Sequence, residues 1–523
     1  MALLRSSAVV AVYTLLSRVL GYARDILIAR YLGTTGVVEA FVVAFRFPNL
    51  FRRLVAEGAF TAAFVPMFAQ KLEKEGRQAA LRLADQVLAV MLVALIALTV
   101  LAEIFMPQLI FLIAPGFSAN PELFDAAVLF TRITMPYLLC MALVALMSGM
   151  LNSAYKFAAA SFVPVLLNLI MMAALVLARD RFATPAHALS WAVALGGVAQ
   201  FVFLAFACRR AGLALRLPRP RLTPEVKRLL RKMVPGAIGA GMAQFNLLVG
   251  TIIASFLSGA VTYLYFADRL YQFPLSMIGT AIGTALLPEL ARKLQSDGKG
   301  AMDVQNRAVE FSMLLTLPAT AALIAIPGAI ITVMFQYGKF TAADASATAA
   351  ALAAYAAGLP GFVLIKVLSP GFFARQDTRS PVVYAVIGMV VNVALSIASV
   401  WTLGHVGIAL ATSVASSLNA FLLGYFLIKR GYWTWDAALK HRLPRYIGAS
   451  AIMGLALWPA ANFLQPWIVA DDAKLRIAAI VLLVAGGMAL YAALCLASGA
   501  AKVSDVTRYL RRRKKTPIAP PPE

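Results

Sequence analysis

Apolar residues run through this sequence in stretches of about 20 positions, the length that an α-helix needs to cross the hydrocarbon core of a bilayer. Polar residues gather in the short segments between these stretches. The sequence lacks the short alternating segments that are typical of an outer-membrane β-barrel. We therefore expect an all-α polytopic membrane protein with about fourteen transmembrane helices. Clear examples of the expected spans lie at 87–105, 126–151, 162–178, 188–208, 382–402 and 477–497.

The composition excludes an ordinary soluble domain. Of the 523 residues, 61% are hydrophobic and only 13% are charged, and the mean hydropathy is +0.82. The first apolar segment starts near Ser7, carries charged residues, and shows no small-residue cleavage site after a short apolar core. These features indicate a retained helix rather than a signal peptide.

The net charge of +24 is informative because of its placement. If the N-terminus is cytoplasmic, most basic loop residues fall on the inner side, including the dense group at 209–232 and the tail at 511–515. The positive-inside rule then predicts an even number of spans and two cytoplasmic termini. Topology explains the basic excess, so we expect no nucleic-acid partner, whereas anionic membrane lipids should be attracted to these loops.

The chain repeats itself weakly after about 220 residues, as transporters built from parallel repeats do. "FVPMFAQKLEKEG" near the end of the second span resembles "LLPELARKLQSDG", and Pro136 and Asn168 recur as Pro360 and Asn392 at the same separation. The predicted organisation is an N-lobe of six spans (1–208), a basic cytoplasmic linker (209–232), a C-lobe of six spans (233–430), two extra helices (431–498) and a basic, Pro-rich cytoplasmic tail (499–523). The lobes should be related by a pseudo-twofold axis along the membrane normal.

Arginines inside the apolar segments are the candidate functional residues, and six of them occur: Arg18, Arg24, Arg46, Arg52, Arg53 and Arg269. A charge near the bilayer centre costs at least roughly 2.5–3.5 kcal/mol, so such residues usually face a wet cavity on a substrate path. Helical spacing places Ser17, Arg18, Arg24 and Asp25 on one side of the first span.

The second span carries a similar stripe of Glu39, Arg46, Arg53 and Glu57, with Asn49 beside it. Pro48 should break or kink this helix, and the backbone groups that it frees should line a cavity. Because arginines outnumber carboxylates, the pattern favours an anionic substrate such as a diphosphate, which accepts forked hydrogen bonds from guanidinium groups.

Two alternatives remain open. In the first, the charges neutralise one another as buried ion pairs: Arg24 with Asp25, Arg53 with Glu57, and Arg269 with Asp268. The second is an integral-membrane enzyme, but most of the 23 acidic residues lie in loops and no paired acid or His cluster occurs. The three cysteines and three histidines are isolated, so we expect no disulfide, metal site or cofactor.

Four segments resemble the MurJ (MviN) lipid II flippases of the multidrug, oligosaccharidyl-lipid and polysaccharide exporter superfamily: "SRVLGYARDILIARYLG", "FRFPNLFRRLVAEGAFTAAFVPMF", "FADRLYQFPLSMIGTAIGTALLPELAR" and "FFARQDTRSPV". The resemblance runs from about Ser7 to the last span. It implies fourteen helices, two lobes around a central cavity, and two C-terminal helices that form a lipid-tail groove. It also implies translocation of the undecaprenyl-diphosphate-linked peptidoglycan precursor to the outer leaflet of the bacterial inner membrane.

The resemblance also implies roles for individual residues. Arg18, Arg24 and Arg269 match the cavity arginines that engage the diphosphate, and Arg52 matches a further essential cation. Asn49, Arg53 and Glu57 are its neighbours, while Ser17 and Asp25 match the residues that position the first pair. Glu39 stands where the family usually has Asp, which keeps the charge and lengthens the reach.

Energy coupling and partners are expectations of the same kind. Some family members resemble sodium-coupled machines, but the seventh span here, about 235–257, has no carboxylate, so membrane potential is the preferred driving force. Expected partners are lipid II, membrane lipids, and cell-wall synthesis or division proteins. The alternative functions are export of another lipid-linked oligosaccharide and multidrug antiport within the same superfamily.

Overall fold

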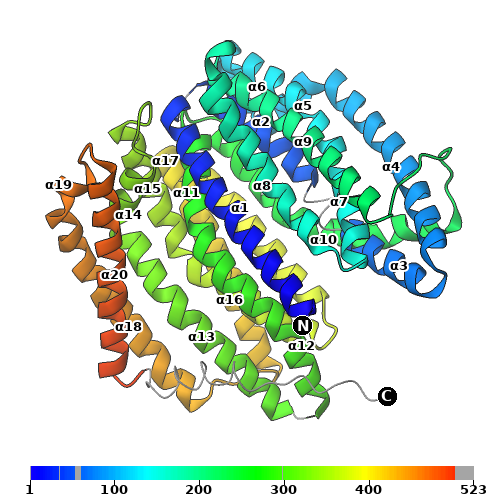
Figure 1. The fold of residues 1–523 in the computed structure, drawn as a ribbon. Helices are drawn as coiled ribbons and strands as arrows, with labels where there is room; N and C mark the ends of the chain where they lie inside the picture. The colour runs from blue at the N-terminus through cyan, green and yellow to red at the C-terminus, as the bar shows by residue number, and fades with distance from the viewer. Residues whose placement is uncertain (1, 35, 53–59, 297, 501–523) are drawn as a thin grey trace. The chain divides into compact units, whose positions relative to one another are not determined.

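The computed structural model describes residues 2–34, 36–52, 60–296 and 298–500. Within these ranges every long element is a helix and no strand occurs, so the all-α prediction is confirmed (Figure 1). The α-helices are α1 (Ala2–Leu32), α2 (Val37–Phe51), α3 (Thr61–Lys74), α4 (Arg77–Ile104), α5 (Met106–Ile113), α6 (Pro121–Thr134), α7 (Pro136–Ser153), α8 (Phe157–Ala173), α9 (Pro185–Arg210), α10 (Pro224–Ala254), α11 (Ala260–Leu275), α12 (Ala281–Ser296), α13 (Gly298–Ala325), α14 (Pro327–Phe335), α15 (Ala342–Ala357), α16 (Leu359–Phe373), α17 (Arg379–Lys429), α18 (Ala437–Phe463), α19 (Gln465–Ile468) and α20 (Ala473–Ala497).

Short helical segments of other types connect some of these helices. They are the 3₁₀ segments η2 (Pro115–Ala119) and η4 (Arg179–Arg181), and the π segments η3 (Ala174–Ala178) and η5 (Ser276–Thr280). The long element α17 is two helices joined at Gly404, where φ is 57° and ψ is −140°. A positive φ costs a glycine little, because it has no Cβ.

Eight helical segments in the described ranges are long and apolar enough to cross a membrane, judged by length and composition. The spans that we expected lie within them to within one residue, at α4, α6–α7, α8–η3, α9, α17 and α20. The span predicted at 126–151 is divided between α6 and α7, because Pro136 has no backbone N–H and so begins a new helix. The total of about fourteen stays a prediction.

The structure divides into two compact units. Unit 1 comprises Met1–Phe266, Phe335–Asp344 and Leu395–Ile408. Unit 2 comprises Ala267–Met334, Ala345–Ala394 and Ala409–Glu523. The lobe boundaries inferred from the sequence repeat stay a prediction.

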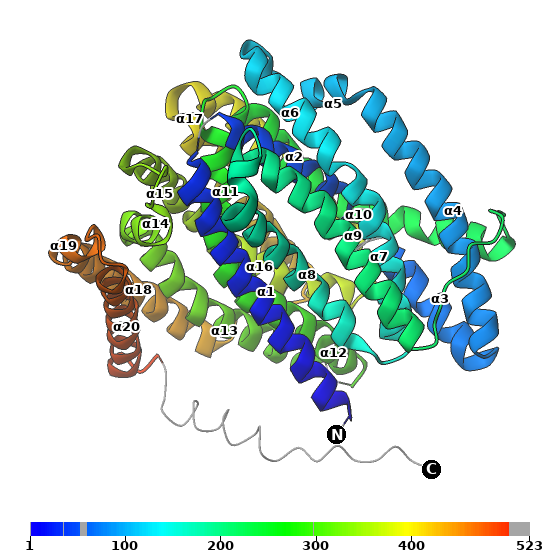
Figure 2. The same cartoon turned by 45° about the horizontal axis from the view of Figure 1, so that its top comes forward.

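In unit 1, α1 packs on α8, α2 packs on α6, and α9 packs on both α7 and α8 (Figures 1 and 2). Glycines allow the close approach of α9. A Cβ atom at Gly197 would lie 2.9 Å from the ring of Tyr137, and one at Gly196 would lie 2.6 Å from Leu167. Small residues at helix contacts are typical of membrane proteins, where packing rather than hydrophobic burial holds helices together.

In unit 2, the C-terminal helices α18 and α20 pack on α13 and α14, around a buried cluster that includes Met453, Leu457 and Leu483. Pro318 cannot donate a backbone hydrogen bond, which leaves the carbonyl of Leu314 without its helical partner. The hydroxyl of Tyr491 donates to that carbonyl over 2.9 Å. Helix α20 therefore satisfies a backbone group that the proline of α13 frees.

Helices α16 and α17 of unit 2 approach each other through small residues. A Cβ atom at Gly358 would lie 2.6 Å from the Cα of Ser413, and one at Gly361 would lie 2.8 Å from the backbone nitrogen of Ser417. The hydroxyl of Ser413 also lies 2.6 Å from the carbonyl of Ala354, in the last turn of α15. Those terminal carbonyls have no partner inside their own helix, so the serine stabilises the end of α15.

Candidate functional site

Arg24 is the most deeply buried of the described arginines that we singled out, with 6% of its surface exposed. Its guanidinium group forms an ion pair with the neighbouring carboxylate, because Nη2 lies 2.7 Å and Nε 3.1 Å from Oδ1 of Asp25. The guanidinium also lies over the ring of Phe45, 5.6 Å from its centroid. The ion pair that we considered from the sequence is therefore present, and both partners belong to α1.

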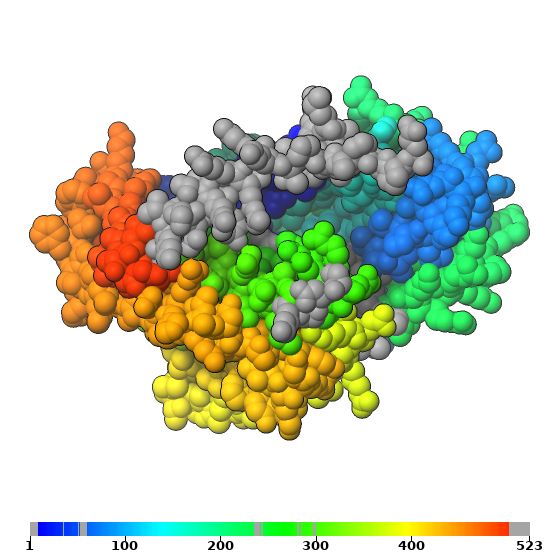
Figure 3. Space-filling model, turned by 90° about the horizontal axis from the view of Figure 1, so that it is seen from below, coloured from blue at the N-terminus to red at the C-terminus, as the bar shows by residue number. Residues whose placement is uncertain are grey.

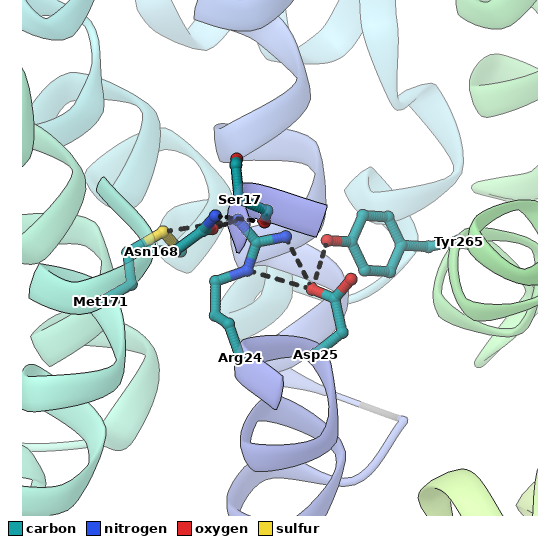
Figure 4. A network of polar contacts seen from close by, with 6 residues as sticks. All are labelled: Ser17, Arg24, Asp25, Asn168, Met171 and Tyr265. Atoms are coloured by element: carbon teal, nitrogen blue, oxygen red, sulfur yellow. Dashed lines mark hydrogen bonds and ion pairs between the residues drawn. The ribbon is translucent and has the colours of Figure 1, made fainter. Parts of the chain in front are cut away.

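A polar residue of α8 completes the surroundings of this arginine. The Oδ1 atom of Asn168 accepts a hydrogen bond from Nη1 of Arg24 over 2.9 Å, and its Nδ2 donates to the backbone carbonyl of Ser17 over 3.0 Å (Figure 4). Ser17 thus enters the network through its backbone carbonyl. Asn168 fixes the arginine and the helix that carries it at the same time.

A tyrosine of α11 joins the network from the other side. The hydroxyl of Tyr265 donates to Oδ1 of Asp25 over 3.2 Å (Figure 4). The guanidinium of Arg46, on α2, lies 5.6 Å from the centroid of the same ring and donates to the hydroxyl of Thr251 over 3.1 Å. Tyr265 therefore contacts both the carboxylate of Asp25 on α1 and the guanidinium of Arg46 on α2. We define Arg24, Asp25, Asn168 and Tyr265 as the arginine network.

The second half of α2 holds Arg52 through its neighbour Asn49. The Nε atom of Arg52 donates to Oδ1 of Asn49 over 3.0 Å, and Nδ2 of Asn49 donates to the carbonyl of Phe45 over 2.6 Å. The predicted closeness of Arg52 and Asn49 is therefore confirmed. Arg53 and Glu57, which we predicted to lie beside them, are outside the described residues.

The expectation for Pro48 is wrong in one part. We expected a break or a kink, and α2 continues through Pro48 to Phe51 without a break, while a kink stays a prediction. The carbonyl that this proline deprives of a donor is that of Ala44, and it lies 3.0 Å from the hydroxyl of the fully buried Thr134 on α6. A side chain from a neighbouring helix thus satisfies the freed carbonyl.

The carboxylate of Glu39, a residue of α2, lies at the start of α11. This carboxylate is 2% exposed and accepts hydrogen bonds from the backbone N–H groups of Gly259 and Val261. The first N–H groups of a helix have no partner inside the helix, so an anion at this position satisfies them and interacts favourably with the helix dipole. The atom Oε1 of Glu39 makes no hydrogen bond within the described part of the chain.

The remaining candidates are less tightly held or belong to unit 2. Arg18 is half-buried on α1. Arg269 is half-buried in unit 2, where the carboxylate of its neighbour Asp268 accepts a hydrogen bond from Gln272. The joint action of Arg18, Arg24 and Arg269 on one ligand stays a prediction.

Sequence reasoning missed Tyr265 and Thr251, and it noted Asn168 only as part of the repeat. Tyr265 lies three and four positions before Asp268 and Arg269, so the helical spacing of that motif was a usable signal. Thr251 offered no such signal, since hydroxyl residues are common in apolar helices.

Chemically, the site holds a guanidinium between hydrogen-bond acceptors in a buried environment. In the described residues, no group of three metal-ligating side chains occurs.

Comparison with known proteins agrees with this architecture. The sequence profile of the family "Lipid II flippase MurJ" matches residues 28–477. A probable lipid II flippase MurJ of Rhizobium meliloti is 44% identical over 519 residues, covering 98% of this chain and 97% of the relative. The lipid II flippase MurJ of Burkholderia cenocepacia is 38% identical over 470 residues, covering 88% and 91%.

Solved structures share the fold. A lipid II flippase MurJ in an inward closed conformation superposes with a TM-score of 0.78 at 24% identity, covering 96% of this chain and 99% of that one. An inward-facing multidrug resistance MATE family transporter gives a TM-score of 0.68 at 15% identity, covering 81% and 95%. The profile and the full-length relatives together show that this chain is a multi-pass membrane protein of the lipid II flippase MurJ family.

Proposed function

We propose that this protein is a lipid II flippase, a transporter rather than an enzyme. It translocates the undecaprenyl-diphosphate-linked peptidoglycan precursor from the inner to the outer leaflet of the cytoplasmic membrane by alternating access. Full-length similarity to proteins named lipid II flippase supports the substrate. The observation that carries the chemistry is the buried guanidinium of Arg24, held between Asp25 and Asn168.

The arginine network suggests how the substrate is recognised. A guanidinium group presents five N–H donors in a planar fork, which matches phosphate oxygens in pairs. In the state described, three of these donors point at Asp25 and Asn168. We propose that a diphosphate replaces part of these contacts, so that Arg24 exchanges protein acceptors for phosphate oxygens. Arg18 and Arg52, both in unit 1, supply further positive charge.

Orientation follows from the charges of unit 1. Lys71, Arg77 and the linker 209–232 lie at one end of its helices, because Arg77 contacts the linker and Lys71 pairs with Glu225. The positive-inside rule supports a cytoplasmic position for this end and for both termini. The diphosphate head group would then enter from the side on which the precursor is made.

Membrane potential is the driving force that we propose. The span at 235–257 has no carboxylate, and the polar residues Asn392 and Ser396 of α17 are buried and neutral. Neutral oxygens alone bind a hard cation weakly. Moving one charge through the membrane potential supplies about 2.3 kcal/mol per 100 mV. Collapsing the potential with a potassium ionophore should therefore stop translocation, whereas replacing sodium at constant potential should not.

The function is tested in bacterial cells that lack their own lipid II flippase and express this chain. We expect the wild-type protein to restore lipid II in the outer leaflet, measured by its accessibility to an external cleaving enzyme. Arg24→Ala should abolish the signal, and Arg24→Lys should strongly reduce it, because an ammonium group lacks the forked geometry. If lipid II stays inside although the wild-type protein is inserted, the substrate is wrong, and other lipid-linked saccharides become the leading candidates.

A further inference from the structure

The linker between α9 and α10 is pinned to the neighbouring helices of unit 1. The backbone N–H of Arg216 donates to Oδ1 of Asp85 over 2.7 Å, and Nη2 of Arg77 donates to the carbonyl of Ala211 over 2.6 Å. Lys71 on α3 forms an ion pair with Glu225 in the first turn of α10. The linker therefore runs beside α3 and α4, as Figures 1 and 2 show. We call residues 209–232 the strap.

The level of the strap in the membrane follows from α4. Between Asp85 and Glu103 this helix contains no charged residue. The two positions are 18 residues apart, about 27 Å at the helical rise of about 1.5 Å per residue. That length is close to the hydrocarbon thickness of about 30 Å, so Asp85 marks one border of the hydrocarbon core. The backbone at Arg216, bound to Asp85, therefore lies at the level of the lipid head groups.

Two kinds of exposed side chain on the strap bear on its surroundings. Leu217 and Leu222 are 64% and 58% exposed, which is unusual for leucines on an ordered connection. The other kind is a set of nine exposed basic residues: Arg209, Arg210, Arg216, Arg219, Arg221, Lys227, Arg228, Arg231 and Lys232. The single acidic residue of the strap, Glu225, is paired with Lys71. In the space-filling view of Figure 3, the green surface of this region adjoins the blue surface of α3 and α4.

Arginines interleaved with exposed leucines at head-group level are the pattern of an interfacial lipid-binding segment. Each basic residue near an anionic leaflet adds electrostatic attraction to the head groups, and apolar side chains add burial in the acyl boundary. Pro218 and Pro220 prevent the segment from folding into a helix, so it stays extended along the surface. We propose that the strap is a binding site for anionic phospholipid head groups of the leaflet that it faces.

An anionic lipid surface fits better than an acidic protein partner. A protein partner would have to reach a segment held at the membrane border, whereas lipid head groups already surround that level. The exposed leucines also need an apolar environment, and the acyl boundary supplies it without a further partner. The proposal does not depend on the transported substrate, because the strap and the arginine network share no residue.

The test measures equilibrium binding of tail-labelled phosphatidylglycerol to the full chain in neutral detergent micelles, with tail-labelled phosphatidylcholine as the head-group control. The strap variant carries Arg216→Gln, Arg219→Gln and Arg221→Gln together. These changes leave the backbone hydrogen bond from residue 216 to Asp85 in place. The matched control removes the same charge from exposed residues of unit 2, through Arg379→Gln, Lys440→Gln and Arg445→Gln. A third variant combines Leu217→Ser and Leu222→Ser.

We expect the wild type to prefer phosphatidylglycerol, with an affinity that falls as salt is added. The strap variant should bind it roughly tenfold to hundredfold more weakly and with a shallower salt dependence, while the control keeps the wild-type affinity. The leucine variant should bind more weakly with an unchanged salt dependence. Equal binding of the two lipids by the wild type would overturn the proposal and leave an acidic protein as the occupant. An equal loss in the control would also overturn it, because net charge alone would then explain binding.

Discussion

The hydroxyl of Tyr265 donates to Oδ1 of Asp25, the same oxygen atom that pairs with the guanidinium of Arg24. One carboxylate oxygen thus joins α1 to α11. Because Asn168 holds the other side of the guanidinium, residues of three helices fix one arginine. An arginine that is held in this way presents its remaining surface in a defined direction, which is the condition for recognising a diphosphate by geometry as well as by charge.

Replacing Tyr265 with Phe should loosen this arrangement without a change of shape. The variant loses one hydrogen bond to a charged group, which we expect to lower the free energy of unfolding by about 0.5–1.5 kcal/mol. Transport of lipid II should fall severalfold. This fall should be larger than the decrease in folded protein that the loss of stability would cause. The leaflet-accessibility assay measures the transport, and thermal unfolding in detergent measures the stability. Tyr13→Phe on α1 is the control, because its ring contact with Phe162 does not need the hydroxyl. Wild-type transport by Tyr265→Phe would show that the bond to Asp25 has no part in function.

Local sequence properties predicted much of this structure. Apolar runs identified the membrane helices because a bilayer demands about 20 apolar residues for each span. The pairing of Arg24 with Asp25 was also within reach, since the two residues are neighbours and a buried charge needs compensation. The contact between Asn49 and Arg52, three positions apart, was expected from the family resemblance, and helical spacing allows it.

Contacts between distant segments were not predictable in this way. Asn168 lies 144 positions after Arg24, and Tyr265 lies 240 positions after Asp25, so no helical spacing relates them. The partner of the carbonyl that Pro48 frees was not predictable for the same reason. A proline in one helix reveals which carbonyl it frees, but only the packing of α6 on α2 reveals that Thr134 reaches that carbonyl.

Two glycine substitutions should have opposite effects, because Gly361 lies at the close contact of α16 and α17 whereas Gly448 of α18 has open space beside it. Gly361→Ala would place its Cβ 2.8 Å from the backbone nitrogen of Ser417, so the helices must separate, at a cost of about 1–3 kcal/mol. Gly448→Ala, in the middle of α18, meets no atom within 4 Å and should stabilise the protein by about 0.5–1 kcal/mol, because alanine favours a helix. Thermal unfolding of both variants in the same detergent checks the pair. A stable Gly361→Ala would mean that α16 and α17 are not held in close contact.

Acid should weaken the loop between α16 and α17. Partial burial tends to raise the pKa of Asp377, but hydrogen bonds from Ser380 and the ion pair with Arg430 outweigh it and hold the pKa below its ordinary value. The ionised carboxylate therefore stabilises the folded state above the unfolded pKa of about 3.9, and this contribution disappears as pH falls through the lower folded pKa.

Thermal unfolding of the wild type and Asp377→Asn between neutral and acid pH measures this effect. The variant should be less stable at neutral pH, and the difference should shrink towards zero below the folded pKa. Asp471→Asn, at an exposed position between α19 and α20, removes the same charge and serves as a control. The difference in stability between this variant and the wild type should stay constant across the pH range. A constant gap between Asp377→Asn and the wild type at every pH would exclude the carboxylate as its source.

Thr134 and Pro48 should be coupled although they lie on different helices. Thr134→Val keeps the shape but removes the donor near the buried carbonyl of Ala44, and we expect a loss of about 1 kcal/mol. In a Pro48→Ala background, the new backbone N–H can bond that carbonyl within α2, so Thr134→Val should cost clearly less. A double-mutant cycle measured by unfolding in detergent isolates the difference. The hydroxyl of Thr134 also lies 3.2 Å from the carbonyl of Thr131, and if that were its real partner, the two substitutions would be additive.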